Sequence, residues 1–327
     1  MRRREFIAGL GSAAAWPLAA RAQQTALPVI GLLHSSSPAT ARPGNLAGFQ
    51  QGLANEGYVE GRNLAVEYRW ANGRDELLPE LAADLVRRRV AVIVTMGNTP
   101  AALAGKAATQ TIPIVFSVGT DPIEYGLVAS LSRPGGNATG VSSPVSAVMA
   151  KRLQMLHEVV PAANLIAYLA NPTNISNQNE ARELSNVARS LGVRLLVLNV
   201  VHVDDIEAIF GRLVEARVGA LLVSGDQLLF AHGDEITANA RRFGIPTSYA
   251  NRAWVLAGGL MSYETNVFET SRTAGAYTGR ILKGEKPGDL PVQQFSKMEF
   301  VVSLRSAKAL GLTIPPALLA FADEVIE

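Results

Sequence analysis

Short apolar runs alternate with amphipathic segments along the chain from Leu27 onward. The runs are rich in Val and Ile and end in polar or glycine residues, a pattern that predicts β-strands. In the first half the predicted strands are Pro28–Leu33, Leu64–Tyr68, Val90–Thr95 and Pro113–Ser117. In the second half they are Leu165–Leu169, Val193–Val200, Gly219–Val223 and Ile245–Ser248.

Amphipathic helices are predicted between these strands. Asp75 is expected to cap one helix, whose apolar face consists of Leu77, Leu81, Leu85 and Val86. Another begins at Asp205, with an apolar stripe at Ile206, Ile209, Phe210, Leu213 and Val214. Strands that are apolar throughout and separated by helices indicate parallel sheets covered on both faces. The sequence therefore predicts an α/β fold.

The two halves of the chain resemble each other locally. Residues 89–98 parallel residues 217–226, Thr111–Phe116 parallels Gly244–Tyr249, and Val29–Pro38 parallels Leu165–Asn174. Convergence of generic strand–helix units accounts for some of this similarity. Three matches in the same order favour two lobes of one topology.

The first residues have the three parts of an export signal. A basic head precedes the apolar run Ile7–Ala20, and an Ala-x-Ala cleavage site ends at Ala22. The run is too short and too rich in small residues to serve as a membrane anchor. Arg3 and Arg4 fit the twin-arginine type of signal, and an ordinary secretory signal with three arginines is the alternative. Cleavage after Ala22 places the mature protein in the periplasm.

Charge and residue usage exclude several classes of function. The whole chain has 30 Lys and Arg against 28 Asp and Glu, but residues 1–22 hold four of the arginines and one of the glutamates. The mature chain is therefore slightly acidic, and nothing in its charge favours a nucleic-acid partner. The absence of cysteine excludes thiol nucleophiles, thiolate metal sites and disulfides. The four histidines are far apart, so no local metal-binding pair is expected.

Catalytic motifs are missing as well. Gly105-Lys106 suggests a phosphate loop, but the position of its first glycine is Pro100. No Gly-x-Ser-x-Gly elbow occurs. His34 follows the first strand as a possible base, although a loop histidine that lines a cleft or is solvated is the favoured alternative. Asp121 before Pro122 suits either catalysis or a cap. We therefore expect no enzyme, no cofactor and no metal.

Three stretches resemble a known family. Ile114–Gly140, Ala257–Tyr263 and Lys308–Pro315 are similar to segments of the ABC-transporter substrate-binding proteins that include tryptophan- and tyrosine-binding members. The resemblance covers about Pro28 to Pro316. It implies a type I periplasmic-binding fold, in which two Rossmann-like lobes are joined by a three-segment hinge. It also implies a monomer that closes on a small solute and docks on an ABC permease in the inner membrane.

The resemblance also suggests lobe boundaries. After the export signal 1–22, the N-terminal lobe is expected at 27–141 plus 262–287. The C-terminal lobe is expected at 145–258 plus 291–327. Gly- and Pro-rich clusters at residues 140–144, 258–263 and 286–291 would be the crossings, and surface turns are the alternative explanation for these clusters.

The ligand of an open parallel sheet lies beyond the carboxyl ends of the strands, where helices begin. The loops predicted there carry mostly hydroxyl and amide side chains, which suit a polar head group. From the family, hydroxyls and helix N-termini of the first lobe would hold a carboxylate, and Asp226 would hold an ammonium group. The candidate ligand-binding residues are Ser36, Asn98, Thr99, Ser117, Thr120, Ser142, Asn171, Thr173, Asp226, Tyr249 and Asn251. Tyr125, Phe230, Trp254 and Tyr263 are further aromatic candidates, for which core packing is an equal alternative.

These features favour the solute-binding component of an ABC importer, with an amino acid or aromatic acid as its carboxylate-bearing ligand. A periplasmic sensor of the same fold is one alternative. A two-domain Rossmann enzyme is another, and the missing cofactor and nucleophile motifs count against it.

Overall fold

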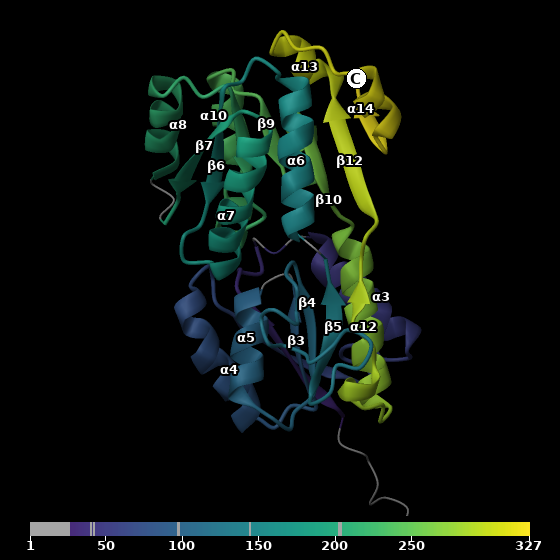
Figure 1. The fold of residues 1–327 in the computed structure, drawn as a ribbon. Coiled ribbons are helices and arrows are strands. Elements are labelled where there is room, and N and C mark those ends of the chain that lie inside the picture. The colour runs from purple at the N-terminus through teal and green to yellow at the C-terminus, as the bar shows by residue number, and fades with distance from the viewer. Residues whose placement is uncertain (1–26, 40, 42, 97–98, 144, 202–204) are drawn as a thin grey trace, which may run out of the picture.

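The chain folds into two lobes that lie one above the other (Figure 1). The computed structural model describes residues 27–39, 41, 43–96, 99–143, 145–201 and 205–327. The predicted export signal and Asn98 lie outside these residues. No helix within the described ranges is long and apolar enough to cross a membrane.

The N-terminal lobe is built on a six-stranded parallel sheet in the order β11-β5-β4-β3-β1-β2. Its strands are β1 (Val29–His34), β2 (Ala65–Trp70), β3 (Val92–Met96), β4 (Ile114–Val118), β5 (Ala138–Ser142) and β11 (Gln293–Gln294). Its main helices are α3 (Pro43–Asn55), α4 (Leu78–Arg87), α5 (Thr99–Ala108) and α12 (Val267–Leu282). Helices α4 and α5 cover one face of the sheet, and α3 and α12 cover the other (Figure 1).

Helices α3 and α12 pack with their backbones in close contact. A Cβ on Gly52 would lie 2.0 Å from the carbonyl oxygen of Arg272, and one on Gly275 would lie 2.1 Å from that of Phe49. Glycine is therefore required on both helices. This packing joins α3, near the start of the chain, to α12, which follows strands β6 to β10 of the C-terminal lobe in the sequence.

The C-terminal lobe has a seven-stranded sheet in the order β13-β12-β10-β9-β8-β6-β7. Its strands are β6 (Leu165–Ala170), β7 (Arg194–Asn199), β8 (Ala220–Val223), β9 (Thr247–Tyr249), β10 (Met261–Thr265), β12 (Met298–Ser303) and β13 (Glu324–Ile326). Its helices are α6 (Val145–Val159), α7 (Ile175–Ser190), α8 (Asp205–Glu215), α9 (Gln227–Ala231), α10 (Gly233–Arg242), α11 (Arg252–Leu256), α13 (Leu304–Ala309) and α14 (Pro316–Phe321). Neighbouring strands from β7 through β6, β8 and β9 to β10 pair in parallel, whereas β10 pairs antiparallel with β12.

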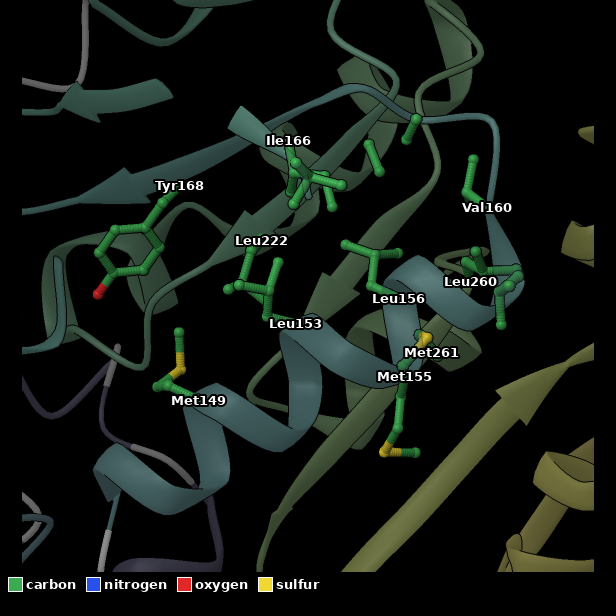
Figure 2. Packing of buried hydrophobic residues seen from close by; sticks show 14 of the residues in the cluster. Met149, Leu153, Met155, Leu156, Val160, Ile166, Tyr168, Leu222, Leu260 and Met261 are labelled. Atoms are coloured by element: carbon green, nitrogen blue, oxygen red, sulfur yellow. The ribbon is translucent and has the colours of Figure 1, made fainter. Parts of the chain in front are cut away.

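The apolar faces of the helices form a core on each side of each sheet. In the C-terminal lobe, Met149, Leu153 and Leu156 of α6 lie against Ile166 and Leu222 of the sheet (Figure 2). The other face is covered by α8, α9, α10 and α11. Burial of such apolar surface is the main driving force for folding, at roughly 25 cal/mol per Å². The α/β fold with two similar lobes is confirmed.

All eight predicted strands are present, within a few residues at their ends. The repeat extends to backbone geometry, because Arg89 and Arg217 both have a left-handed conformation, with φ of 54° and 53°. Two helix details differ from expectation. Asp75 begins a 3-10 turn, η1 (Asp75–Leu77), before α4, so it is not the helix cap. Val214 is 49% exposed, because it lies at the edge of the apolar stripe of α8.

Two of the three crossings lie later in the chain than expected. Strand β10 stays in the C-terminal sheet as far as Thr265, because Met261–Thr265 pairs with β12. Residues 262–265 therefore belong to the second lobe, and the chain crosses between Thr265 and α12. Residues 293–294 pair with β5 of the first sheet, so the last crossing lies between β11 and β12. Long-range strand pairing, rather than the glycine and proline clusters, sets these positions.

Candidate functional site

A cleft lies between the lobes, at the carboxyl ends of β4 and β8. It encloses about 970 Å³ of empty space, including space open to solvent. The first lobe contributes Asn45, Thr99, Ser117 and Thr120, and the second contributes Arg152, Asn174, Asn177, Glu180 and Asp226. The cleft thus occupies the place where an open parallel sheet binds its ligand.

The wall formed by the first lobe is neutral and rich in hydroxyls. Thr99 is the first residue of α5, and its hydroxyl lies 3.0 Å from that of Thr120, which follows β4. Ser117 adds a further hydroxyl, and it is 8% exposed. Asn45 is 1% exposed, and its Oδ1 accepts no hydrogen bond from the part of the chain that the structure describes. The hydroxyls can donate to an anionic or polar head group, whereas the Asn45 Oδ1 requires a donor.

His34 lies behind this wall rather than in the cleft. It is buried at the end of β1, and its ring nitrogens contact Ser36 at 2.9 Å and Asn45 at 3.4 Å. The ring also lies 5.2 Å from that of Trp70. The expectation of a cleft-lining or solvated loop histidine is therefore wrong, because the end of the strand packs inside the lobe. His34 orients Asn45 and Ser36.

Asp226 is on the opposite wall and caps α9. Its carboxylate accepts hydrogen bonds from the backbone N–H of Leu228 at 2.9 Å, from Asn171 at 3.2 Å and from Asn174 at 2.8 Å. Burial raises its pKa, and the three donors oppose this shift. Asp75 of the first lobe does not line the cleft, but its pKa is raised to about 6 by burial first and then by the charge of Asp226. The two acidic groups, from different lobes, therefore lie close enough to repel each other.

Glu180 is the second carboxylate of this wall. Its Oε2 accepts hydrogen bonds from the Tyr168 hydroxyl and from Asn177, the latter at 3.2 Å. Burial raises its pKa to about 7, although Tyr168 and Arg152 pull the pKa down. A carboxyl group in this state is poorly solvated and is stabilised by any cation that arrives.

Arg152 is the cation of this wall and is fully buried. Its guanidinium donates to the carbonyl oxygens of Val223 at 2.8 Å and Ser248 at 2.6 Å. It belongs to α6, three residues after Met149, and its Nη1 lies 3.0 Å from the Met149 sulfur. Arg152 therefore ties α6 to β8 and β9 and offsets part of the charge of Glu180.

The structure brings together four of the predicted ligand-binding residues: Thr99, Ser117, Thr120 and Asp226 all line the cleft. Asn171 and Thr173 lie one layer behind, where Thr173 bonds to Asn171 and Asn171 bonds to Asp226. Ser142 lines a smaller adjoining chamber. Asn98 lies outside the described residues.

Three predicted residues lie elsewhere. Ser36 bonds to His34, and Asn251 caps α11 by accepting from the backbone N–H of Ala253 at 2.7 Å. Tyr249 is buried in the core, with its ring 5.5 Å from that of Trp254. Phe230 belongs to the same aromatic group, 5.3 Å from Trp254. Of the aromatic candidates, Tyr263 lines the cleft and Tyr125 lines the adjoining chamber.

The sequence predictions missed Asn45, Arg152, Asn174, Asn177 and Glu180. A signal was present for the last three, because residues 174, 177 and 180 are spaced by three and share one face at the start of α7. Arg152 is a lone charge within an apolar helix face. Within residues that the structure describes, no three His, Cys, Asp or Glu side chains come together as a metal site.

A cleft between two similar lobes, with binding groups at the strand ends, is the site of a solute-binding protein. The fold is that of the type I periplasmic binding proteins. Residues 36–326 match the model of the ABC transporter substrate binding protein family, and the chain belongs to that family. Its members are binding components rather than enzymes, and they work outside the cytoplasm.

Three relatives illustrate the match. The tyrosine-binding protein of Clostridioides difficile is 26% identical over 81% of this chain and 76% of its own length. A conserved domain protein of Vibrio cholerae has a TM-score of 0.81 and 27% identity, covering 91% of this chain and 99% of that one. The ABC domain from Streptococcus pneumonia, solved in complex with L-Trp, has a TM-score of 0.79 and 26% identity over the same shares.

Proposed function

We propose that this protein is the periplasmic solute-binding component of an ABC importer, and that it closes its lobes on a small carboxylate-bearing solute. The solute is an amino acid or an aromatic acid, and the loaded monomer delivers it to a permease in the inner membrane. The observation that carries this proposal is the opposition of a neutral hydroxyl wall and a charged wall across one cleft.

The first lobe would hold the carboxylate of the solute. Thr99 and Thr120 present adjacent hydroxyls, and Thr99 begins α5, whose N-terminal end carries the positive pole of the helix dipole. Charge-assisted hydrogen bonds of this kind are about twice as strong as neutral ones. The first lobe therefore recognises an anion without a cation of its own among the cleft-lining residues described.

The second lobe would hold the ammonium group. Asp226 is 5% exposed, and within the described part of the chain its hydrogen-bond donors are all neutral, with no direct ion pair to balance its charge. An ammonium group bound beside Asp226 would offset the repulsion between Asp226 and Asp75. Ligand binding and lobe closure would then favour each other.

Three further observations support this function. The hydroxyl of Tyr125 in the first lobe accepts a hydrogen bond from Asn179 on α7 of the second, a contact that a closed form can use. Of the relatives described above, one is a tyrosine-binding protein and another was solved in complex with L-Trp. The leader with its cleavage site after Ala22 supplies the route to the periplasm.

A thermal-shift screen across amino acids, aromatic acids and purines tests the proposal. A ligand at one hundred times its Kd should stabilise the protein by about 2.7 kcal/mol. Mass spectrometry of whatever copurifies with the protein identifies the solute directly. A screen in which no compound raises the Tm, with nothing copurifying, would contradict the proposal.

Asp226→Asn tests the ammonium site. Asn is also a good helix cap, so α9 keeps its N-terminus while the charge is lost. We expect amino acids to bind at least tenfold more weakly and deaminated acids with the same side chain to be nearly unaffected. Asp289→Asn, in the 3-10 turn at the far end of α12, is the matched control. Equal losses for both ligand classes would remove this role from Asp226.

A further inference from the structure

A smaller chamber opens from the side of the cleft. It has about 720 Å³ of empty space, including space open to solvent. It shares Thr120, Ser176 and Glu180 with the main cleft, so the two spaces adjoin. A ligand whose head group lies in the main cleft can extend its far end into this chamber.

In the ranges that the structure describes, the ionisable Asp and Glu side chains that line this chamber are not accompanied by any basic residue. Among the described residues that line it there are four carboxylates and no Lys, Arg or His. Asp121 and Glu124 come from the first lobe, and Glu180 and Glu183 come from the second. Arg182 is near Glu183 on α7, but its guanidinium donates to Asn179 and to the carbonyl oxygen of Gln178. We call this space the acidic chamber, defined by its four carboxylates.

The acidic chamber also contains a buried hydroxyl that is available to a ligand. Ser142 lines it and is 1% exposed, and its hydroxyl has no hydrogen-bond partner within the described ranges. A buried polar group without a partner is destabilising, and a ligand with an N–H donor would satisfy the Ser142 hydroxyl.

The arrangement favours an organic cation over a metal ion. Calcium requires six to eight oxygen ligands at 2.3–2.6 Å, gathered around one point. The described side chains provide no group of three such acidic residues close enough to hold a metal. Moreover, the Asp121 carboxylate already accepts from the backbone N–H of Ile123 at 2.8 Å. Carboxylates spread over the chamber suit an amine or guanidinium with several donors.

We propose that the solute carries a second cationic group, an amine or a guanidinium, and that the acidic chamber receives it. This inference rests on the proposed function, because the head group of the same solute lies in the main cleft. It narrows the substrate class to basic amino acids and amine-bearing relatives of them. Glu180, at the junction of the two spaces, is the buried contact, and Glu124 and Glu183 form the rim.

Isothermal titration calorimetry with L-arginine and L-citrulline tests the proposal, since the two have nearly the same shape and differ in charge. L-Lysine and L-norleucine make a second pair. We expect each cationic member to bind at least tenfold more tightly than its neutral partner. The preference should fall as salt is raised, because the rim carboxylates are exposed.

The double variant Glu124→Gln and Glu183→Gln locates the preference. Both residues are exposed and outside the main cleft, so the fold should be kept. We expect the preference for arginine over citrulline to fall to threefold or less, with citrulline binding unchanged. Glu158→Gln with Glu215→Gln is the matched control, because both glutamates are exposed and outside the cleft and the acidic chamber, and it should leave both affinities as they were.

The outcomes separate the two proposals. If citrulline, norleucine or aromatic amino acids bind as tightly as arginine and lysine, the acidic chamber does not select a cation, while the proposed function stands. An equal effect of the double variant on both members of a pair would overturn the proposal in the same way. If no amino acid, aromatic acid or amine binds at all, the proposed function itself fails.

Discussion

The two walls of the cleft are built on the same topology but differ in chemistry. Every charged side chain among the described residues that line the main cleft comes from the second lobe: Arg152, Glu180, Asp226 and Glu264. The first lobe contributes hydroxyls, mainly at the corresponding strand ends, and one amide, from Asn45 of α3. A repeated scaffold therefore fixes where ligand groups converge, and the side chains decide what each wall can bind.

The difference also has an energetic consequence. The hydroxyls on the first wall carry no charge, and their loss leaves no buried ion without its counter-charge. The charges on the second wall are buried in a hydrogen-bonded network, which couples them to the stability of the lobe. Changes in the second wall should therefore affect folding and binding, whereas changes in the first should affect binding alone.

The largest effect is expected for Arg152→Met. The substitution keeps most of the side-chain length but leaves the carbonyl oxygens of Val223 and Ser248 unpaired and Glu180 without its nearby cation. Removing one partner from such a buried network costs about 3–5 kcal/mol. Urea denaturation should show this loss. Arg212→Met, at an exposed position on α8, is the control and should change stability by less than about 0.5 kcal/mol. If Arg152→Met unfolded at the same urea concentration as the wild type, the second wall would not be coupled to folding.

The next largest effect is expected from the ionisation of Glu180, which should make the free energy of unfolding depend on pH. Its pKa is about 7 in the folded protein against an ordinary value of 4.5, so the folded state keeps a proton that the unfolded state releases between these values. The free energy of unfolding should therefore fall as pH rises from about 5 to 8, by on the order of 2 kcal/mol. Glu180→Gln cannot ionise and should lack this loss.

Urea denaturation at pH 5, 6.5 and 8 measures the effect of Glu180. Asp75 and Asp226 also have raised pKa values and contribute in the same direction, so the informative quantity is the difference between wild type and Glu180→Gln at each pH. Glu215→Gln, at an exposed position on α8 away from the cleft, is the control and should follow the wild type. Parallel curves for wild type and Glu180→Gln would refute a raised pKa at this residue.

On the first wall, Thr120→Val should weaken ligand binding without unfolding the lobe. Valine has nearly the shape of threonine but removes the hydroxyl that lies 3.0 Å from Thr99. A hydrogen bond to a charged carboxylate contributes about 1.5 kcal/mol, which corresponds to roughly tenfold in Kd. Calorimetry and thermal denaturation should show weaker binding with an unchanged Tm.

Thr111→Val, away from the cleft, is the control and should change neither the Kd nor the Tm. A lower Tm for Thr120→Val alone would contradict the expectation that changes in the first wall affect binding but not folding.

The smallest effect is expected where the lobes are alike. Arg89 and Arg217 follow α4 and α8 in left-handed conformations, and the next residue in each case bonds back to the helix, Val90 to Leu85 and Val218 to Leu213. Glycine is preferred at such positions. Arg89→Gly and Arg217→Gly should each stabilise the protein by about 0.5 kcal/mol, since relief of backbone strain exceeds the entropy cost of glycine. Arg212→Gly within α8 is the control and should destabilise the protein. If one of Arg89→Gly and Arg217→Gly stabilised the protein and the other destabilised it, the two positions would not be equivalent.

Much of the fold follows from local sequence pattern. The parallel strands are short apolar runs, and the repeat between the halves extends to the left-handed arginines. The crossings were harder to predict, because glycine clusters at 258–263 indicated a turn between lobes. Strand β10 continues to Thr265 through its pairing with a strand more than thirty residues later, and no local pattern reports such pairing.

The site divides in the same way. Thr99, Thr120 and Asp226 were predicted because strand ends converge in a parallel sheet. Arg152 and Glu180 were missed because they lie within helices, where the packing angle of the helix decides which face meets the cleft. Tyr249 was placed by the same strand-end argument, but its ring turns into the core towards Trp254.

By itself, the sequence determined the class of fold, the number of lobes and the edge of each sheet that faces the ligand, because hydrophobic period and chain order are local properties. The tertiary structure alone decided which helix faces complete the cleft, how the buried charges are paired and where the chain passes between lobes. Those features depend on contacts between residues far apart in the chain, and their energies exist only once the lobes have packed.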